Sequence, residues 1–104
     1  MTFKEDITTR IKIDFGIKSD EVFERLTQAI EKTEYISNDR VIRSIIFLSE
    51  GNLQELNRYI EVATYDTRDV MFWAEYENLN NNSNPKRIRD FNKTFEESTN
   101  DVKE

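Results

Sequence analysis

Carboxylates are the main side chains left for acid–base or metal-binding chemistry in this sequence, because the chain contains no histidine and no cysteine. It therefore lacks a thiol nucleophile, a disulfide, the ligands of a structural zinc site and an imidazole general base. Three carboxylate pairs remain as candidates, Asp66 with Asp69, Glu75 with Glu77, and Glu50 with Glu55. On a helix the first pair falls in the amino-terminal turn, where acids stabilise the helix, and the second pair points about 200° apart. We predict no catalytic residue, metal ligand or cofactor, and we favour a protein that is not an enzyme.

Arg68 and Glu75 are the two polar residues of this region that ordinary helix chemistry explains least. Arg68 falls in the first turn of the expected helix, where the positive end of the helix dipole disfavours a cation. We therefore expect Arg68 to bind an acid on another helix or a ligand. Glu75 lies beyond the first turn, so helix capping does not account for it.

The basic cluster at residues 86–89 is followed by Phe91 and Phe95. Cations interleaved with aromatic rings can hold a nucleic acid by charge neutralisation and base stacking. The whole chain, however, has 15 basic and 21 acidic residues and a net charge of -6. Because phosphate backbones are bound mainly by Lys and Arg, nucleic acid is an unlikely main partner. We expect the two phenylalanines to dock on the helices or on a partner.

The composition predicts the elements that position these residues. A chain of 104 residues with two glycines and one proline favours helices joined by short turns. The expected fold is all-α, a single compact domain of about five helices in an orthogonal or irregular helical bundle. We assign residues 1–96 to this domain and residues 97–104 to a flexible C-terminal tail.

The segment 2–15 is ambiguous between helix and strand. Ile11, Ile13 and Phe15 alternate with charged residues, as in a half-buried strand. Ile7, Ile11 and Phe15 are also four residues apart, and Gly16 can supply the left-handed residue that ends a helix. We favour a helix, because we find no second strand to pair with this one.

Capping residues predict where the next helices begin. The expected first residues or caps are Ser19 or Asp20, Ser37 or Asn38, Asn52, and Asp66. Residues 78–84 read as an Asn-rich loop. Asn84-Pro85 then predicts a final helix in which Ile88, Phe91 and Phe95 share one face.

The stretch 66–79 carries the only tryptophan and a dense run of large apolar side chains. On a helix, Trp73 falls on one side and Phe72 and Tyr76 fall on nearly the opposite side. A helix with two apolar faces needs two partners, so we expect it to be enclosed by neighbouring elements. Phe47 likewise falls outside the apolar stripe of its own helix. It either packs under arginine side chains or belongs to a contact surface.

Five stretches of the chain form a recognisable pattern: residues 40–48, 51–63, 68–70, 74–76 and 87–93. In this pattern the sequence resembles a group of small bacterial proteins of unassigned function. The resemblance implies no activity and no site residues.

The charge and the lack of catalytic groups favour a protein–protein interaction module, similar in action to an immunity protein or antitoxin that binds a basic partner. Self-association is the other form that such binding could take. The speculative partner-binding residues are Phe47, Arg43, Arg68, Glu75, Phe91 and Phe95.

The alternative is a small-molecule-binding protein or a carboxylate-dependent enzyme. Its pocket would be lined by Trp73, Tyr76, Tyr59 and Arg68. No apolar run has the length of a signal peptide or a membrane span, so we expect a cytoplasmic protein that does not enter the membrane.

Overall fold

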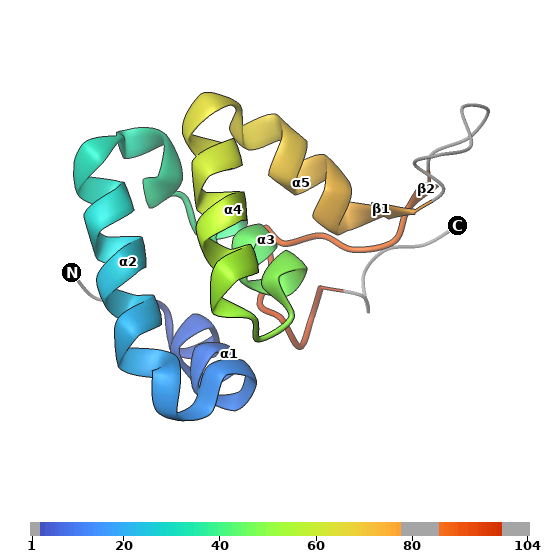
Figure 1. Cartoon of the computed structure of the whole chain (residues 1–104). Helices are drawn as coiled ribbons and strands as arrows, with labels where there is room; N and C mark the ends of the chain where they lie inside the picture. The colour runs from blue at the N-terminus through green and yellow to red at the C-terminus, as the bar shows by residue number, and fades with distance from the viewer. Residues whose placement is uncertain (1–2, 78–85, 99–104) are drawn as a thin grey trace.

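The computed structural model describes residues 3–77 and 86–98, which form an all-α domain (Figure 1). The α-helices are α1 (Glu5–Phe15), α2 (Ser19–Lys32), α3 (Asp39–Ser49), α4 (Leu53–Tyr65) and α5 (Thr67–Glu75). The 3-10 turns η1 (Gly16–Lys18) and η2 (Glu34–Ser37) follow α1 and α2. Two short strands, β1 (Tyr76–Glu77) and β2 (Lys86–Arg87), pair antiparallel. The radius of gyration of 13.3 Å is that of a compact domain of about 100 residues.

The ambiguous first segment is a helix. Ile7, Ile11 and Phe15 are buried along one side of α1, which confirms the four-residue spacing over the strand alternation. Ile13, which the strand interpretation would have placed inside, is 71% exposed. Gly16 ends the helix with a φ of +57°, a backbone angle that glycine adopts without steric cost.

Three of the predicted helix caps are confirmed. The side chain of Asn38 accepts hydrogen bonds from the first turn of α3, Asn52 accepts one from Glu55, and Asp66 accepts one from Arg68. Ser19 differs from the prediction, because it is the first residue of α2 and its hydroxyl donates to the Gly16 carbonyl.

The core is centred on α3, which packs against α1, α4 and α5. The turn between α3 and α4 presses against the end of α1, because a Cβ at Gly51 would lie 2.5 Å from the main-chain oxygen of Asp14. Fully buried apolar side chains come from every helix: Ile7, Ile11, Val22, Leu26, Ile36, Ile45, Ile46, Leu56 and Val70.

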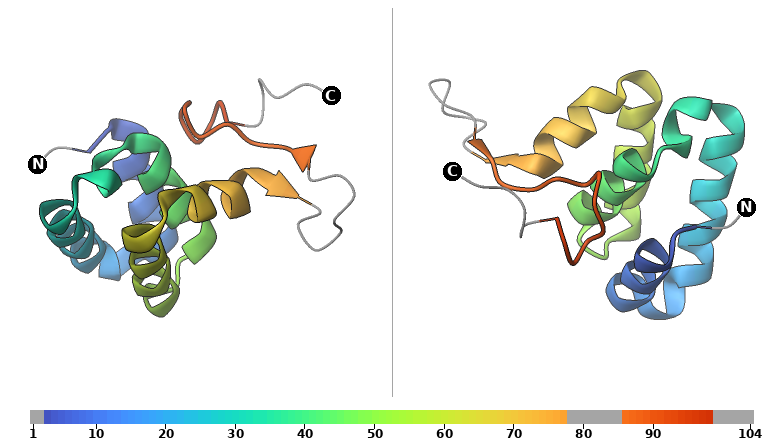
Figure 2. Two further views of the ribbon diagram at one scale, coloured as in Figure 1. Left: turned by 90° about the horizontal axis from the view of Figure 1, so that it is seen from above. Right: turned by 180° about the vertical axis from the view of Figure 1, so that it is seen from behind.

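The predicted final helix at residues 84–96 is wrong over its described part. After β2 the chain has no regular secondary structure through Ser98. This C-terminal segment, residues 86–98, returns along α5 and passes over α3 toward α1 (Figure 2). The amides of Phe91 and Phe95 donate to carboxylates on the helices, and those of Asp90, Lys93 and Glu97 donate to carbonyls within the segment. None of these amides donates to the carbonyl four residues earlier, so the helical ladder does not form.

The helix expected at residues 66–79 ends at Glu75, because Ile88 and Arg89 donate their main-chain N–H groups to the Glu75 carbonyl. The expected enclosure of this helix is also wrong, since Phe72 and Trp73 are 40% and 38% exposed. The second partner that its two apolar faces require is not found in the described part of the chain.

The predicted domain boundary at residue 96 falls within the C-terminal segment, where Ser98 is buried. The predicted Asn-rich loop and the rest of the predicted tail, residues 78–84 and 99–104, lie outside the described residues. None of the described helices has the length and apolarity needed to cross a membrane.

Candidate functional site

The side of α5 turned away from the core is the first candidate site. Its residues recur at the spacing of one helical face: Asp69, Phe72, Trp73 and Tyr76. We call this set the outer face of α5. The prediction that Trp73 lies on nearly the opposite side from Phe72 and Tyr76 is wrong, because Trp73 is three residues, less than one turn, from Tyr76 and is exposed together with Phe72. The opposite side carries Val70 and Ala74, which are fully buried. Aromatic side chains of this size are normally mostly buried, so the exposure of Phe72 and Trp73 requires an explanation.

Ring contacts hold the aromatic side chains of the outer face in place. The ring centroids of Phe72 and Tyr76 are 4.9 Å apart. Trp73 meets Tyr59 of α4 edge to face at 6.3 Å, and the Arg58 guanidinium lies 5.3 Å from the Tyr59 ring. The aromatic surface therefore extends from α5 onto α4, and the rings need little further ordering to bind a partner.

One acidic side chain of the outer face, Asp69, is left without an ion pair in the described part of the chain. Asp69 forms no ion pair with any described residue, whereas Asp66 and Glu55 are paired with arginines. An exposed carboxylate without a partner can attract a cation from another molecule.

Of the two roles expected for Arg68, binding an acid on another helix is wrong, and binding a ligand stays a prediction. Its Nε and Nη2 atoms lie 3.0 and 2.9 Å from the carboxylate of Asp66, and its side chain is 84% exposed. The helix-capping carboxylate thus sits beside the cation that the helix dipole disfavours. Hydrogen bonds from Arg68 lower the pKa of Asp66.

The second candidate site surrounds Glu75, whose side chain is fully buried. Its carboxylate accepts from Nε and Nη2 of Arg40 at 2.9 and 2.6 Å, from Nη2 of Arg87 at 3.2 Å and from the Phe91 amide at 2.9 Å. Hydrogen bonding to Glu75 raises the pKa of Arg40. Burial of this carboxylate is therefore compensated by charged donors from α3 and from the C-terminal segment.

A second buried ion pair lies between α1 and α3. Arg43 donates from Nε and Nη2 to the two carboxylate oxygens of Asp6, each at 2.9 Å, and from Nη1 to the Phe91 carbonyl at 3.0 Å. Asp6 also accepts from the Phe95 amide at 3.1 Å. Burial alone would raise the pKa of Asp6, but the Arg43 and Phe95 donors outweigh it, so the pKa of that carboxyl is lowered.

A cluster of three aromatic rings connects the C-terminal segment to α3. Phe91, which is 1% exposed, lies 5.5 Å from Phe47 and 5.4 Å from Phe95 between ring centroids. The arginine that covers the Phe47 ring is Arg89, whose guanidinium carbon lies 4.2 Å from the ring centroid. Arg10 covers Phe95 in the same way at 4.7 Å. Phe47 therefore packs beneath an arginine, but this arginine comes from the C-terminal segment and not from the same helix, where the prediction placed it.

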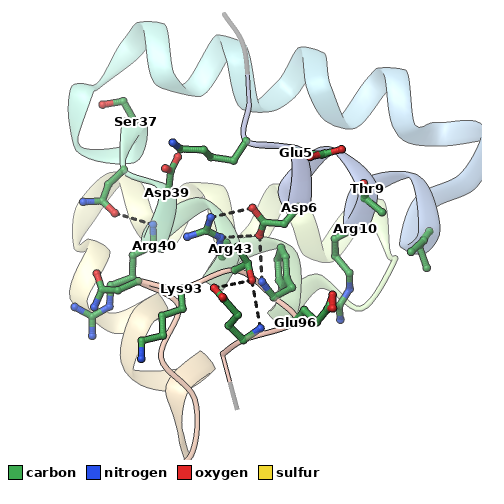
Figure 3. Close-up of a pocket in the computed structure, with 17 residues that line it drawn as sticks. Glu5, Asp6, Thr9, Arg10, Ser37, Asp39, Arg40, Arg43, Lys93 and Glu96 are labelled. Atoms are coloured by element: carbon green, nitrogen blue, oxygen red, sulfur yellow. Dashed lines mark hydrogen bonds and ion pairs between the residues drawn. The ribbon is translucent and has the colours of Figure 1, made fainter. Parts of the chain in front are cut away.

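An open depression of about 1030 Å³ borders the C-terminal segment, α1 and the start of α3 (Figure 3). Cationic and anionic side chains alternate around it, including Glu5, Asp6, Arg10, Arg40, Arg43 and Lys93. Since Arg40 and Arg43 already bind buried carboxylates, the depression has no uncommitted cluster of one charge sign.

The structure brings together most of the predicted site residues, but around the protein's own C-terminal segment. Arg43, Glu75 and Phe91 are buried there, and Phe47 and Phe95 are half-buried beside them, so in this structure a partner meets little of them. Arg68 lies apart on the surface.

Sequence reasoning missed Asp6, Arg40 and Arg87 as members of these clusters. Arg87 stood in the basic cluster, and Arg40 lies three residues before Arg43 on the same side of α3. Asp6 gave no usable signal, because an acid in the first turn of a helix has an ordinary explanation.

The residues predicted to line a small-molecule pocket line neither of two depressions found among the described residues. Tyr59 packs against Trp73, Tyr76 against Phe72, and Arg68 against Asp66. The depression described above and a smaller one of about 420 Å³ between α2 and α4 have other lining residues.

Within residues 3–77 and 86–98, no group of three or more acidic side chains is placed to hold a metal ion. Comparison with known proteins gives no further lead, because no family model, curated protein or solved structure matches the chain.

Proposed function

We propose that this protein is a protein-binding module that docks a basic partner on the outer face of α5. The exposure of Phe72 and Trp73, on a helix whose inner face is already buried, carries the proposal. The described part of the chain covers only the inner face of α5, and an incoming surface can cover the outer face.

A protein surface suits this face better than a small molecule does. Phe72 and Trp73 project from the outside of a helix, whereas small ligands are usually enclosed in concave pockets. Tyrosine, tryptophan and phenylalanine are enriched at the centres of protein interfaces, where rigid rings bury much area at little entropic cost.

The charge favours a basic partner over a second copy of the chain. Two copies would each carry a net charge of -6 and repel one another. The carboxylate of Asp69, unpaired within the described chain, lies about one helical turn from Phe72 and Trp73 and offers a contact for Lys or Arg. Immunity-like or antitoxin-like inhibition of a basic protein is the activity that we propose.

The test is site-specific photo-crosslinking in cells of the source organism. A photoreactive phenylalanine analogue at Phe72 should trap a specific basic protein, and the yield should fall at least about tenfold when Trp73→Ser is added. The matched control carries the analogue at Ile17, which is fully exposed in η1, the turn between α1 and α2.

Three outcomes contradict the proposal. These are equal trapping of the same protein from both positions, trapping of a second copy of the chain alone, and a yield that Trp73→Ser leaves unchanged.

A further inference from the structure

The helices hold the C-terminal segment as they would hold a bound peptide. Charged side chains of the helices bind the main chain of the segment at successive points. The Phe91 N–H donates to Glu75 at 2.9 Å, and the Phe91 carbonyl accepts from Arg43 at 3.0 Å. Four residues later, the Phe95 N–H donates to Asp6 at 3.1 Å.

The charged groups that bind the segment are themselves buried. The Glu75 side chain has no exposure, and the side chain of Arg43 is only 5% exposed. Loss of the segment would remove hydrogen-bond partners from both groups, and an unsatisfied charge in such a site is strongly unfavourable. These side chains are thus arranged for an extended backbone that supplies both an N–H and a carbonyl.

Side chains of the segment add selectivity to this main-chain binding. Phe91 lies beside Phe47, Phe95 meets Phe91 edge to face, and Arg87 binds Glu75. Binding therefore combines an arginine, an aromatic residue four positions later and a second aromatic residue four positions after that.

We propose that Asp6, Arg43, Phe47 and Glu75 form a recognition site for an extended peptide of this chemistry. The chain's own residues 87–95 occupy the site, and a segment of a partner protein with the same spacing of one arginine and two aromatic residues replaces them. The site is separate from the outer face of α5, and the proposal does not rest on the function proposed above.

Attachment to the same chain protects the site from weak competitors. A tethered segment has an effective concentration in the millimolar range, so an external peptide must exceed that range or bind more tightly. Weakening the tethered segment should therefore expose the site to a free peptide at much lower concentration.

The experiment uses the full chain carrying Phe91→Ala and a fluorescein-labelled peptide of residues 86–98. Fluorescence anisotropy should show binding to this variant at least about tenfold tighter than to the wild-type chain, whose site is occupied. A control peptide that carries Phe91→Ala should bind the variant at least about tenfold more weakly than the unaltered peptide.

A second variant is tested in case Phe91→Ala unfolds, and circular dichroism measures the helix content of both variants. Arg87→Ala leaves Glu75 paired with Arg40 and keeps the three phenylalanine rings in contact. It should therefore loosen the segment with a smaller loss of folding stability than Phe91→Ala. Adding Trp73→Ser to either background should leave peptide binding unchanged, which separates this site from the outer face of α5.

Two results overturn the proposal. One is the absence of binding up to about 1 mM peptide in a variant that keeps its helices. That concentration is comparable to the effective concentration of the tethered segment, which is bound. The other is equal binding of the unaltered and control peptides.

Discussion

Glu75 shows how one residue can determine the geometry of a surface from inside. Its carboxylate joins Arg40 of α3 to Arg87 and Phe91 of the C-terminal segment, and its carbonyl accepts the amides that end α5. The aromatic rings of the outer face lie on the same helix within one turn of it. Glu75 therefore positions the proposed binding face without being exposed to a partner.

Replacing this carboxylate should destabilise the fold. Glu75→Gln keeps an acceptor for the Phe91 amide but leaves Arg40 and Arg87 without their shared counter-charge. We expect the free energy of unfolding to fall by about 1–3 kcal/mol in urea denaturation. Glu55→Gln is the matched control, because it breaks a solvent-exposed pair with Arg58 and should cost less than about 0.5 kcal/mol. Equal losses in the two variants would show that the buried position of Glu75 has no special effect.

Asp6 should make stability depend on pH in the acid range. Its folded-state pKa lies below the ordinary value of 3.8, so the unfolded chain takes up the proton first as pH falls. The stabilisation is fully present above pH about 4 and is lost as pH drops through the lowered folded-state pKa. Asp6→Asn should therefore reduce stability at pH 7 and flatten its decline below pH about 4, measured by urea denaturation at each pH. A decline as steep as that of the wild-type chain would contradict this assignment.

At the scale of elements, α5 and the C-terminal segment depend on each other. The segment supplies the hydrogen bonds that end α5, and α5 supplies the carboxylate that holds the segment. In return, Arg89 donates to the Ala74 carbonyl, which the end of the helix leaves without a helical partner. Loosening either element should therefore loosen the other.

Truncation of two phenylalanines on these elements should reduce the free energy of unfolding by very different amounts. Phe91→Ala removes a fully buried ring and should cost about 3–5 kcal/mol of unfolding free energy. Phe72→Ala removes a ring that is 40% exposed and should cost less than about 1 kcal/mol. Urea denaturation of the two variants measures the difference. A large loss for Phe72→Ala would mean that the outer face of α5 serves the fold and not a partner.

Helices were predictable wherever local pattern and capping agreed. Asn38, Asn52 and Asp66 cap as predicted, since a side-chain acceptor beside free amides acts over a few residues. The C-terminal segment was not predictable, because Phe91 and Phe95 have helical spacing but their amides bind acids far away in sequence. Local spacing cannot reveal such long-range competition for hydrogen bonds.

The candidate site was only partly predictable for the same reason. The unusual roles of Phe47 and Glu75 were visible as departures from the helical pattern, whereas their partners Arg87 and Arg89 became evident only in three dimensions. The exposure of Trp73 could not be deduced at all. A second apolar face on a helix can be covered by its own chain or by another molecule, and the sequence pattern is identical in both cases.

At the scale of the whole molecule, net charge should control the speed of association with a basic partner. The net charge of -6 attracts such a partner at long range, and dissolved salt weakens this attraction by screening the charges. Raising salt from about 50 to about 500 mM should lower the association rate constant at least about tenfold and change the dissociation rate constant much less, as measured by surface plasmon resonance. A salt-independent association rate constant would indicate that apolar contact alone guides the encounter.

The hydrogen bond from Phe95 to Asp6 joins residues 89 positions apart. During synthesis, all five described helices leave the ribosome before Phe95 does. Until Phe91 emerges, Arg43 and Glu75 lack their main-chain partners from the C-terminal segment, and until Phe95 emerges Asp6 lacks its own. Chains stalled before this point should therefore remain targets for chaperones and proteases, and completion of the fold reports that translation has passed residue 95.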